Sequence, residues 1–283
     1  MQRRDFIGLL AGAATAWPLA VPAQNMHLTE APRIKNGAPM KGTFDANLGF
    51  PLEDPYWGSF FSAENCNISS TTDLGTLTDA LLEHGLDFSY LPAASCFLLR
   101  GDDAYQGLAS ALSSRAKAPA QSSVLVVRRS NPATRWQELR HARLGYINAY
   151  CTTSYFAPSI LLAREGLALT SFFRAVPVAA WQGQIDAVVD GAIDATMVYE
   201  DVWLARSDNA SQTKILGRLD ALPTPAFIRR ADADLAFTSR LKEALLAFAP
   251  HAGANLLYTG FASYQDTLMQ RFFVDLEKIR RIG

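Results

Sequence analysis

The stretch from Arg143 to Gly166, RLGYINAYCTTSYFAPSILLAREG, decides the fold of this chain. A short apolar strand leads into Cys151 and then into three hydroxyl residues, Thr152–Ser154, which open a helix that ends at Gly166. The first N–H groups of a helix have no acceptor inside it, and they carry the positive end of its dipole. We therefore predict an anion site at this helix start, with the hydroxyls as additional donors. An ordinary N-cap with solvated neighbours is the alternative.

The N-terminus predicts export. A twin-arginine pattern at residues 2–7, QRRDFI, precedes an apolar run from Gly8 to Ala20 and a small-residue stop at residues 21–23. This arrangement is typical of a Tat signal, and its apolar core is too short to span a bilayer as a permanent anchor. We expect residues 1–23 to be a Tat-type signal peptide and the mature protein to reside in the periplasm. An uncleaved signal anchor is the alternative.

The composition is that of an ordinary globular protein, with 49% hydrophobic and 19% charged residues. About 240 residues follow the signal and a polar lead-in at residues 24–41, which is enough for one large domain or two small ones. The formal net charge is −1, and it becomes −2 when the signal, with two arginines and one aspartate, is removed. Because no basic stripe is present, we expect no nucleic-acid partner. We also expect the protein to be soluble and monomeric.

The cysteines and histidines give little support to a metal site. The three cysteines, Cys66, Cys96 and Cys151, are an odd number in an oxidising compartment, so at least one is free or pairs outside the chain. The sequence contains no CxxC motif and no histidine pair at helical spacing. We expect neither a metal nor another cofactor.

Hydrophobic periodicity and turn residues predict that strands and helices alternate along the chain. Gly85 and Gly191 are predicted to end two helices, and the pair Thr134 and Gln137 predicts a capping box before a short helix. The expected strands are residues 42–50, 67–71, 87–91, 121–129, 143–147, 195–199 and 226–229, and the expected longer helices are residues 76–84, 181–190 and 235–248. Alternation of this kind predicts an α/β fold with parallel sheets.

Four blocks of sequence, in order, resemble the periplasmic binding proteins of phosphate, phosphite and phosphonate ABC transporters. They are LEHGLDFSYLP at residues 82–92, WQELRHARLGYIN with CTTSYFAP at 136–148 and 151–158, VVDGAIDA at 188–195, and LPTP with FIRR at 222–225 and 227–230. Other two-lobed binding proteins share the third block, so only the second block points at phosphorus oxyanions. The order and spacing of all four carry the resemblance.

The resemblance implies an α/β fold of the type II periplasmic binding proteins, with two lobes of mainly parallel sheet and flanking helices joined by a two-strand hinge. Ligand held between such lobes selects the closed state. The implied division is residues 42–131 and 222–283 for lobe 1 and residues 132–221 for lobe 2, with the chain crossing at Val124–Arg129 and Ala226–Arg229.

The resemblance also implies an anion site at the helix start of the second block. In the family, a Ser-Thr-Ser sequence donates to the phosphonate oxygens, and the same positions here are Cys151, Thr152 and Thr153. Ser154 replaces a glycine and restores a third hydroxyl, while Tyr155 matches a tyrosine of the family. Because a thiol is a weaker donor than a hydroxyl, the affinity and the identity of the anion do not carry over.

The organic part of the ligand is where the chain departs from the family. Members that bind aminoalkylphosphonates place acidic residues around the ammonium group; one of these positions is Thr224 here, and another falls near Asp201, beside Glu200. A histidine of the family is replaced by Trp181. We hypothesise an anionic head with a less cationic, more apolar tail. Aromatic residues that could line the site, each of which could equally be a core residue, are Tyr56, Trp57, Tyr155, Trp181 and Tyr199.

The implied function is that of a periplasmic solute-binding protein, which delivers a small phosphonate-, phosphite- or phosphate-like oxyanion to an ABC permease in the inner membrane. A ligand sensor without a transporter is one alternative. Others are an enzyme and a soft-metal or redox protein that uses Cys96 and Cys151. Because the chain has no GxSxG motif and no Ser-His-Asp order, we expect no enzyme activity.

Overall fold

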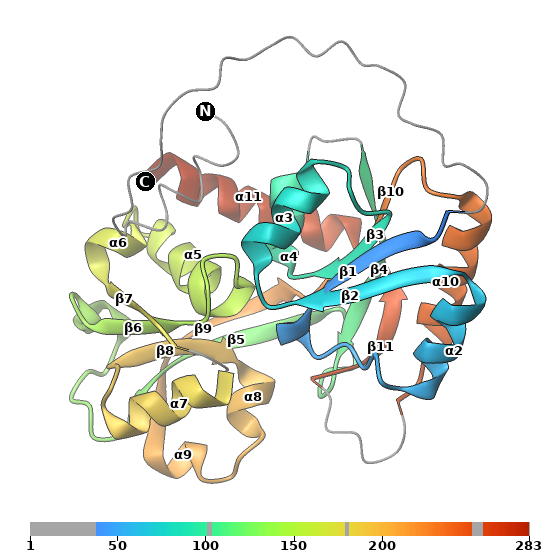
Figure 1. Ribbon diagram of the computed structural model, residues 1–283. Helices are drawn as coiled ribbons and strands as arrows, with labels where there is room; N and C mark the ends of the chain where they lie inside the picture. Colours follow the sequence, from blue (N-terminus) through green and yellow to red (C-terminus); the bar gives the residue numbers. More distant parts are fainter. Residues whose placement is uncertain (1–37, 101–103, 179–180, 251–256, 283) are drawn as a thin grey trace.

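The computed structural model describes residues 38–100, 104–178, 181–250 and 257–282 (Figure 1). The predicted Tat signal at residues 1–23 and most of the lead-in lie outside the described residues. Among the residues that are described, no helix combines the length and the apolar character needed to cross a membrane.

The described residues form two separate sheets, which Figure 1 shows on the right and on the left. The six-stranded first sheet has the order β11-β4-β10-β3-β1-β2, and the five-stranded second sheet has the order β7-β6-β8-β5-β9. The strands of the first sheet are β1 (Met40–Asp45), β2 (Cys66–Thr71), β3 (Phe88–Leu91), β4 (Tyr105–Ser113), β10 (Ala226–Arg230) and β11 (Tyr258–Ser263). Those of the second are β5 (Ala120–Arg128), β6 (Arg143–Tyr146), β7 (Arg174–Pro177), β8 (Ala195–Tyr199) and β9 (Thr213–Pro223).

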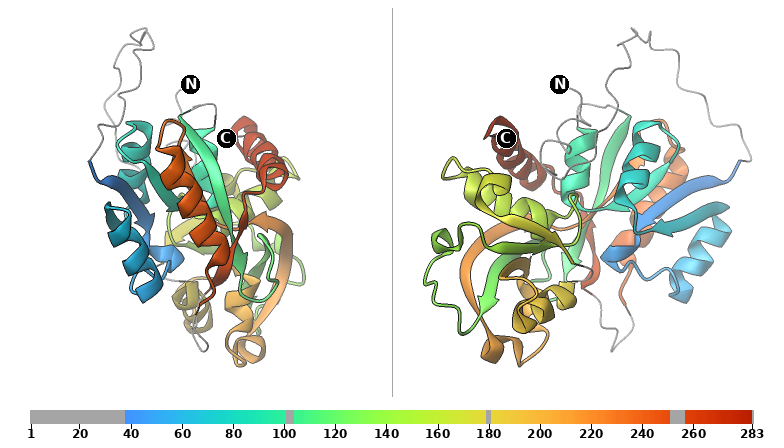
Figure 2. Two further views of the ribbon diagram at one scale, coloured as in Figure 1. Left: turned by 90° about the vertical axis from the view of Figure 1, so that its right-hand side faces the viewer. Right: turned by 60° about the vertical axis from the view of Figure 1, so that its left-hand side comes forward.

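Helices flank both sheets, and the two views of Figure 2 show the same division. Those beside the first sheet are η1 (Ala46–Leu48), α2 (Pro55–Ala63), α3 (Leu74–Leu82), α4 (Ala93–Leu99) and α10 (Leu235–Ala247). Those beside the second are η2 (Trp136–Leu139), η3 (Thr152–Phe156), α5 (Ala157–Ala163), α6 (Leu169–Phe172), α7 (Trp181–Asp190), α8 (Glu200–Leu204) and α9 (Asn209–Gln212). The last helix, α11 (Asp266–Ile282), packs against α4, α5 and β9 and therefore contacts elements of both sheets.

Both sheets are mixed rather than mainly parallel. Strand β1 pairs in parallel with β2 and β3, and β6 pairs in parallel with β7 and β8; helices connect these strands, as parallel pairing requires. Other pairs are antiparallel: β4 pairs in this way with β10 and β11, and β5 with β8 and β9. The predicted α/β class is correct, but these antiparallel pairings were not predicted.

The described chain passes between the sheets at residues 114–119 and 224–225. These two passages lie side by side, since the buried Thr224 hydroxyl donates to the carbonyl oxygens of Ala111 (2.6 Å) and Pro119 (3.0 Å). The predicted crossings were placed wrongly: Val124–Arg129 falls within and just after β5 in the second sheet, and Ala226–Arg229 lies within β10 in the first.

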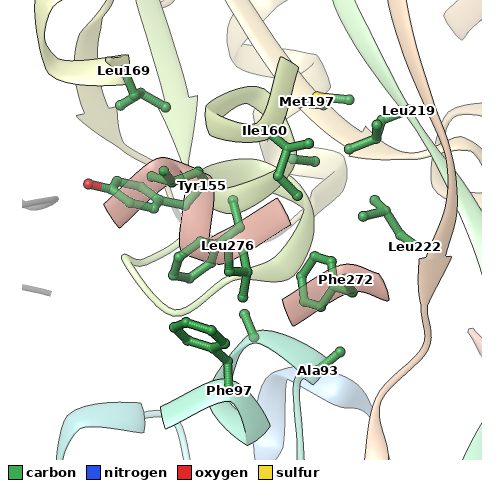
Figure 3. Close-up of a cluster of buried hydrophobic side chains, with 14 of the residues drawn as sticks. Ala93, Phe97, Tyr155, Ile160, Leu169, Met197, Leu219, Leu222, Phe272 and Leu276 are labelled. Atoms are coloured by element: carbon green, nitrogen blue, oxygen red, sulfur yellow. The ribbon is translucent and has the colours of Figure 1, made fainter. Parts of the chain in front are cut away.

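Two large hydrophobic cores stabilise this arrangement, and a small third cluster of Val124, Val126, Ile185 and Val198 lies between the second sheet and α7. Aromatic side chains fill the core of the first sheet, where Phe44, Trp57 and Phe227 are at most 1% exposed. The second core lies between the second sheet, α5, α4 and α11, and Figure 3 shows Phe272 and Leu276 of α11 among its members. Because this core includes residues beside both sheets, α11 holds α4 against α5 and β9.

Local sequence patterns gave several element ends correctly and missed others. Helix α7 ends at Gly191 with φ 79°, as predicted. At the end of α3 the left-handed residue is His84 (φ 56°) instead of Gly85. Glu138, one residue beyond the predicted Gln137, bonds the Thr134 N–H at 2.9 Å, because η2 begins only at Trp136.

Candidate functional site

A tight loop joins β6 to η3 and fixes the start of this helix at the carboxyl end of the strand. The Ile147 N–H donates to Ser154 Oγ at 3.0 Å, and the Tyr150 N–H donates to Asn148 Oδ1 at 2.9 Å. The turn that follows packs beside β8. Carboxyl ends of strands in open α/β sheets are where ligands bind, so the loop places the helix start in a suitable position.

The helix begins with a widened turn. Cys151 is the N-cap residue, and its Sγ accepts from the Ser154 N–H at 3.4 Å. The N–H groups of Tyr155 and Phe156 both donate to the Cys151 carbonyl, at 3.3 and 3.1 Å, so the first turn is π-helical. Among the described residues, the backbone N–H groups of Thr152 and Thr153 have no acceptor. Such turns are frequent at functional sites, and this one presents two adjacent free donors.

The three hydroxyls at the helix start are buried, each being at most 1% exposed. Thr152 Oγ1 accepts from the Ala94 N–H at 3.2 Å, and Ser154 Oγ accepts from Ile147. Thr153 Oγ1 lies 3.4 Å from Cys151 Sγ. A hydroxyl that accepts still has its own proton to donate, so all three groups can contribute donors. Burial also strengthens their interaction with charge, because solvent screens it less.

The start of α4 meets this helix start from the side of the first sheet. Residues Pro92–Ser95 follow β3, and the Ala94–Thr152 hydrogen bond joins the two segments across 58 residues of sequence. Ser95 is 3% exposed, and its hydroxyl has no hydrogen-bond partner among the described residues. Helix α4 was not predicted from the sequence, where only Pro92 directly after the strand marks its start.

Uncharged aromatic residues lie next to the helix start. Tyr199, at the carboxyl end of β8, is 2% exposed, and its ring centroid lies 5.5 Å from that of Trp181 and 6.5 Å from that of Tyr258. Burial raises the pKa of the Tyr199 and Tyr258 hydroxyls well above the usual value, and Cys151 is close enough to both to contribute to this shift. Both tyrosines are therefore neutral at physiological pH. Tyr258 belongs to β11, so the aromatic group spans the two sheets.

The acidic residues of α8 already have partners. Asp201 Oδ2 accepts from the hydroxyls of Ser113 (2.9 Å) and Ser114 (3.3 Å) and from the Arg115 N–H (3.3 Å), which belong to β4 and the passage after it. Glu200 pairs with Arg218 of β9, with 2.7 Å between Oε2 and Nη2. Glu200 is thus paired with a cation, whereas Asp201 keeps its negative charge and is held by three neutral donors.

The other aromatic candidates lie in different places. Trp57 is 0% exposed and packs against Phe61 and Phe248 in the core of the first sheet. Tyr56 is 39% exposed, and its hydroxyl donates to the Ala244 carbonyl at 2.8 Å. Tyr155 is 2% exposed, and Figure 3 shows its ring beside the second core; its hydroxyl is buried and has no partner among the described residues. Trp181 and Tyr199 are therefore the candidates whose rings contact each other, and Tyr199 lies near Cys151.

The cysteines do not form a paired or metal-binding arrangement within the described residues. All three are free thiols. Cys96 influences the pKa of Tyr264, whereas Cys151 influences Tyr199 and Tyr258, so the two buried thiols have different neighbours. Burial raises the pKa of Cys96 to about 12, which keeps it protonated and unreactive. No group of three His, Cys, Asp or Glu side chains in the described ranges could hold a metal ion.

Residues 65–268 match the family model of the periplasmic substrate-binding proteins of phosphonate ABC transporters. The chain belongs to this family. Its members are binding proteins of transporters and are periplasmic, so the predicted family and function class are confirmed at this level. No curated protein matches the sequence.

Solved structures share the fold. The chloride-bound XAC2383 protein of Xanthomonas citri has a TM-score of 0.68 at 17% identity, with 86% of this chain and 99% of that chain covered. A binding protein component of an ABC phosphonate transporter from Pseudomonas aeruginosa, PA3383, has a TM-score of 0.67 at 12% identity, with 86% and 87% covered. PhnD1 of Prochlorococcus marinus, in complex with methylphosphonate, has a TM-score of 0.65 at 14% identity, with 85% and 98% covered. The predicted periplasmic-binding-protein fold is confirmed.

Proposed function

We propose that this protein captures a small phosphonate-, phosphite- or phosphate-like oxyanion between its two sheets and delivers it to an ABC permease in the inner membrane. The observation that carries the proposal is the pair of N–H groups at Thr152 and Thr153, which have no acceptor in the described part of the chain and lie beside three buried hydroxyls. Backbone donors at a helix start, away from water, are well suited to an anion. Export through the Tat pathway would bring the folded protein to the periplasm.

Ligand capture would follow the two-lobed scheme that the sequence predicts, with the first and second sheets as the two lobes; because β5 belongs to the second sheet, the first boundary would lie at residues 114–119 instead of 131–132. The two hydrogen-bonded passages at 114–119 and 224–225 are suited to act as a hinge, because they are adjacent and short. Residues 120–128 pair as β5 within the second sheet, which favours a hinge ahead of them. We propose that the protein works as a monomer.

The proposed role is binding without catalysis. Membership in a family of transporter binding proteins supports it. The chemistry near the helix start agrees, because the Tyr199 and Tyr258 hydroxyls have pKa values raised far above physiological pH and are poor proton acceptors there. A ligand sensor with the same site would bind the same anion; permease and ATPase genes beside this gene would favour the transporter.

Calorimetry on residues 24–283 tests the proposal. The titrants are methylphosphonate, phosphite, phosphate, sulfate and 2-aminoethylphosphonate. We expect at least one phosphorus oxyanion to bind, and the double variant Thr152→Val, Thr153→Val to bind it by a few kcal/mol more weakly, as expected for lost hydrogen bonds to a charged group (~1.5–3 kcal/mol each). The control Thr152→Ser, Thr153→Ser keeps both hydroxyls and should bind much better. Equal affinity in the valine variant, or no phosphorus oxyanion bound by the wild type, would contradict the proposal.

A further inference from the structure

Three buried polar atoms without partners lie around Tyr199. Ser123 is 0% exposed and Gln121 is 6% exposed, and neither Ser123 Oγ nor Gln121 Oε1 has a hydrogen-bond partner among the described residues. The indole Nε1 of Trp181 is also buried, and it too has no partner in the part of the chain that the structure describes. Leaving a buried polar atom unpaired is unfavourable, so three of them close together call for a physical explanation.

The register of the second sheet brings these atoms to one place. Ser123 on β5 lies directly opposite Tyr199 on β8, so both side chains point to the same face. Gln121 lies two residues earlier on β5 and therefore on that face as well. Trp181 approaches from the start of α7, with its ring against that of Tyr199.

The same group of atoms adjoins the anion helix. Tyr199 and Tyr258 are both close to Cys151, the N-cap of that helix. Gln121 Nε2 lies 3.3 Å from the Tyr258 hydroxyl, so the amide is held between the two sheets. In either orientation of this amide, one of its polar atoms stays unpaired. A ligand with its anionic head at Thr152 and Thr153 would therefore extend its tail toward Gln121 and Ser123.

We propose that this site selects an oxyanion whose tail carries a neutral group able both to donate and to accept a hydrogen bond, such as the hydroxyl of a hydroxyalkylphosphonate. This inference rests on the proposed function. The free oxygen of Gln121 takes a donated proton, the Trp181 N–H donates, and the Ser123 hydroxyl does either. An ammonium group would have to compete with the three hydrogen bonds that Asp201 accepts from Ser113, Ser114 and Arg115, and Glu200 is already paired with Arg218. Burying an unpaired charge there is unfavourable.

Matched ligands of nearly equal size test the proposal: 2-hydroxyethylphosphonate, n-propylphosphonate and 2-aminoethylphosphonate, titrated calorimetrically into residues 24–283. We expect the hydroxyl ligand to bind about tenfold to hundredfold more tightly than the propyl ligand, as one or two neutral hydrogen bonds allow, and the amine to bind more weakly than the hydroxyl ligand. Ser123→Ala should reduce the hydroxyl-to-propyl preference by about tenfold. Ser69→Ala is the control, because Ser69 is exposed on edge strand β2 and bonds only the Thr43 hydroxyl among the described side chains.

The outcomes separate this inference from the proposed function. If the propyl and hydroxyl ligands bind equally tightly, the anion site exists but the unpaired atoms are hydrated, and the inference is overturned. Tighter binding of the amine overturns it too. If none of these three phosphonates binds but methylphosphonate, phosphite or phosphate does, the inference alone is overturned. If no phosphorus oxyanion binds at all, the proposed function itself fails. Should Ser123→Ala not fold, Gln121→Met replaces it, with the same loss of preference expected and a retained preference counting against the inference.

Discussion

Replacing Asp45 by asparagine should stabilise the protein near neutral pH. Asp45 ends β1 and is 2% exposed, and burial raises the pKa of its carboxyl from 3.8 to about 6. Its Oδ1 accepts from the Asn47 N–H (3.0 Å) and from Asn47 Nδ2 (2.9 Å), and these bonds offset only part of the desolvation. Asparagine has the same shape and an oxygen that can accept both bonds. The variant therefore removes the buried charge and little else.

The direction and the size of the change in unfolding free energy follow from the raised pKa of Asp45. Because the folded-state pKa lies above the unfolded one, the protonated carboxyl contributes fully below about pH 4, and this contribution is lost as the pH rises to about 6. A rise from 3.8 to about 6 corresponds to about 3 kcal/mol as an upper figure. Relative to the wild type, Asp45→Asn should thus gain up to ~3 kcal/mol in unfolding free energy at pH 7.5 and nearly nothing at pH 4.

Urea unfolding of both proteins at pH 4.0, 5.0, 6.0 and 7.5 measures this difference. The control is Asp73→Asn at the N-cap of α3, because Asp73 is exposed and its hydrogen bonds to Thr76 lower its pKa. That carboxylate contributes stability above its unfolded pKa, so its replacement should not stabilise the protein at pH 7.5. A gain for Asp45→Asn that does not change between pH 4 and 7.5, or no gain at all, would refute the argument that burial of a charge is the cause.

Two further predictions concern packing and the thiols. Gly107→Ala in β4 should lower the unfolding free energy by ~1–3 kcal/mol, because a Cβ there would overlap the Tyr264 ring. The control, Gly58→Ala in α2, places its Cβ in open space and should be neutral or stabilising by up to ~1 kcal/mol. Similar changes in unfolding free energy for the two variants in urea would contradict this prediction. Cys96 and Cys151 are 6% and 7% exposed, so both thiols should react slowly with a disulfide reagent at pH 8 in the native protein and quickly in urea. Fast labelling of either thiol in the native protein would contradict this prediction.

Elements whose ends are set by neighbouring residues could be predicted from the sequence. The bounds of α7 and β8 agree with the predicted ones, since Trp181–Asp190 and Ala195–Tyr199 are bracketed by glycine and turn residues. Helix α2 was not among the predicted helices, although Asp54 caps it and Pro55 occupies its first turn. Strands β4, β9 and β11 were missed, because their antiparallel partners lie far away in the sequence and they show little periodic signal of their own.

Only the part of the candidate site that is formed by neighbouring residues in the sequence could be predicted. The donors at Thr152 and Thr153 follow from a strand that runs into a helix, which the sequence displays directly. The groups placed near this helix start, at Ala94, Gln121 and Tyr258, come from α4, β5 and β11. No short-range pattern connects such residues. A carboxylate near residue 201 was expected to bind a ligand, but Asp201 accepts hydrogen bonds from Ser113 and Ser114. These partners could not be predicted, because they depend on how α8 packs against β4 and the passage after it.

One hydroxyl connects the two halves of the site. Thr152 Oγ1 accepts from the Ala94 N–H, which belongs to the first sheet's side of the molecule, while its own proton is available to a ligand held by the second. A bound anion would polarise this hydroxyl and make its oxygen a better acceptor for Ala94, since hydrogen bonds in a chain strengthen one another at low dielectric. Under the proposed function, anion binding and the approach of α4 to η3 would therefore favour each other. Any ligand that stays clear of the Thr152 hydroxyl would lack this coupling, however tightly its tail is held.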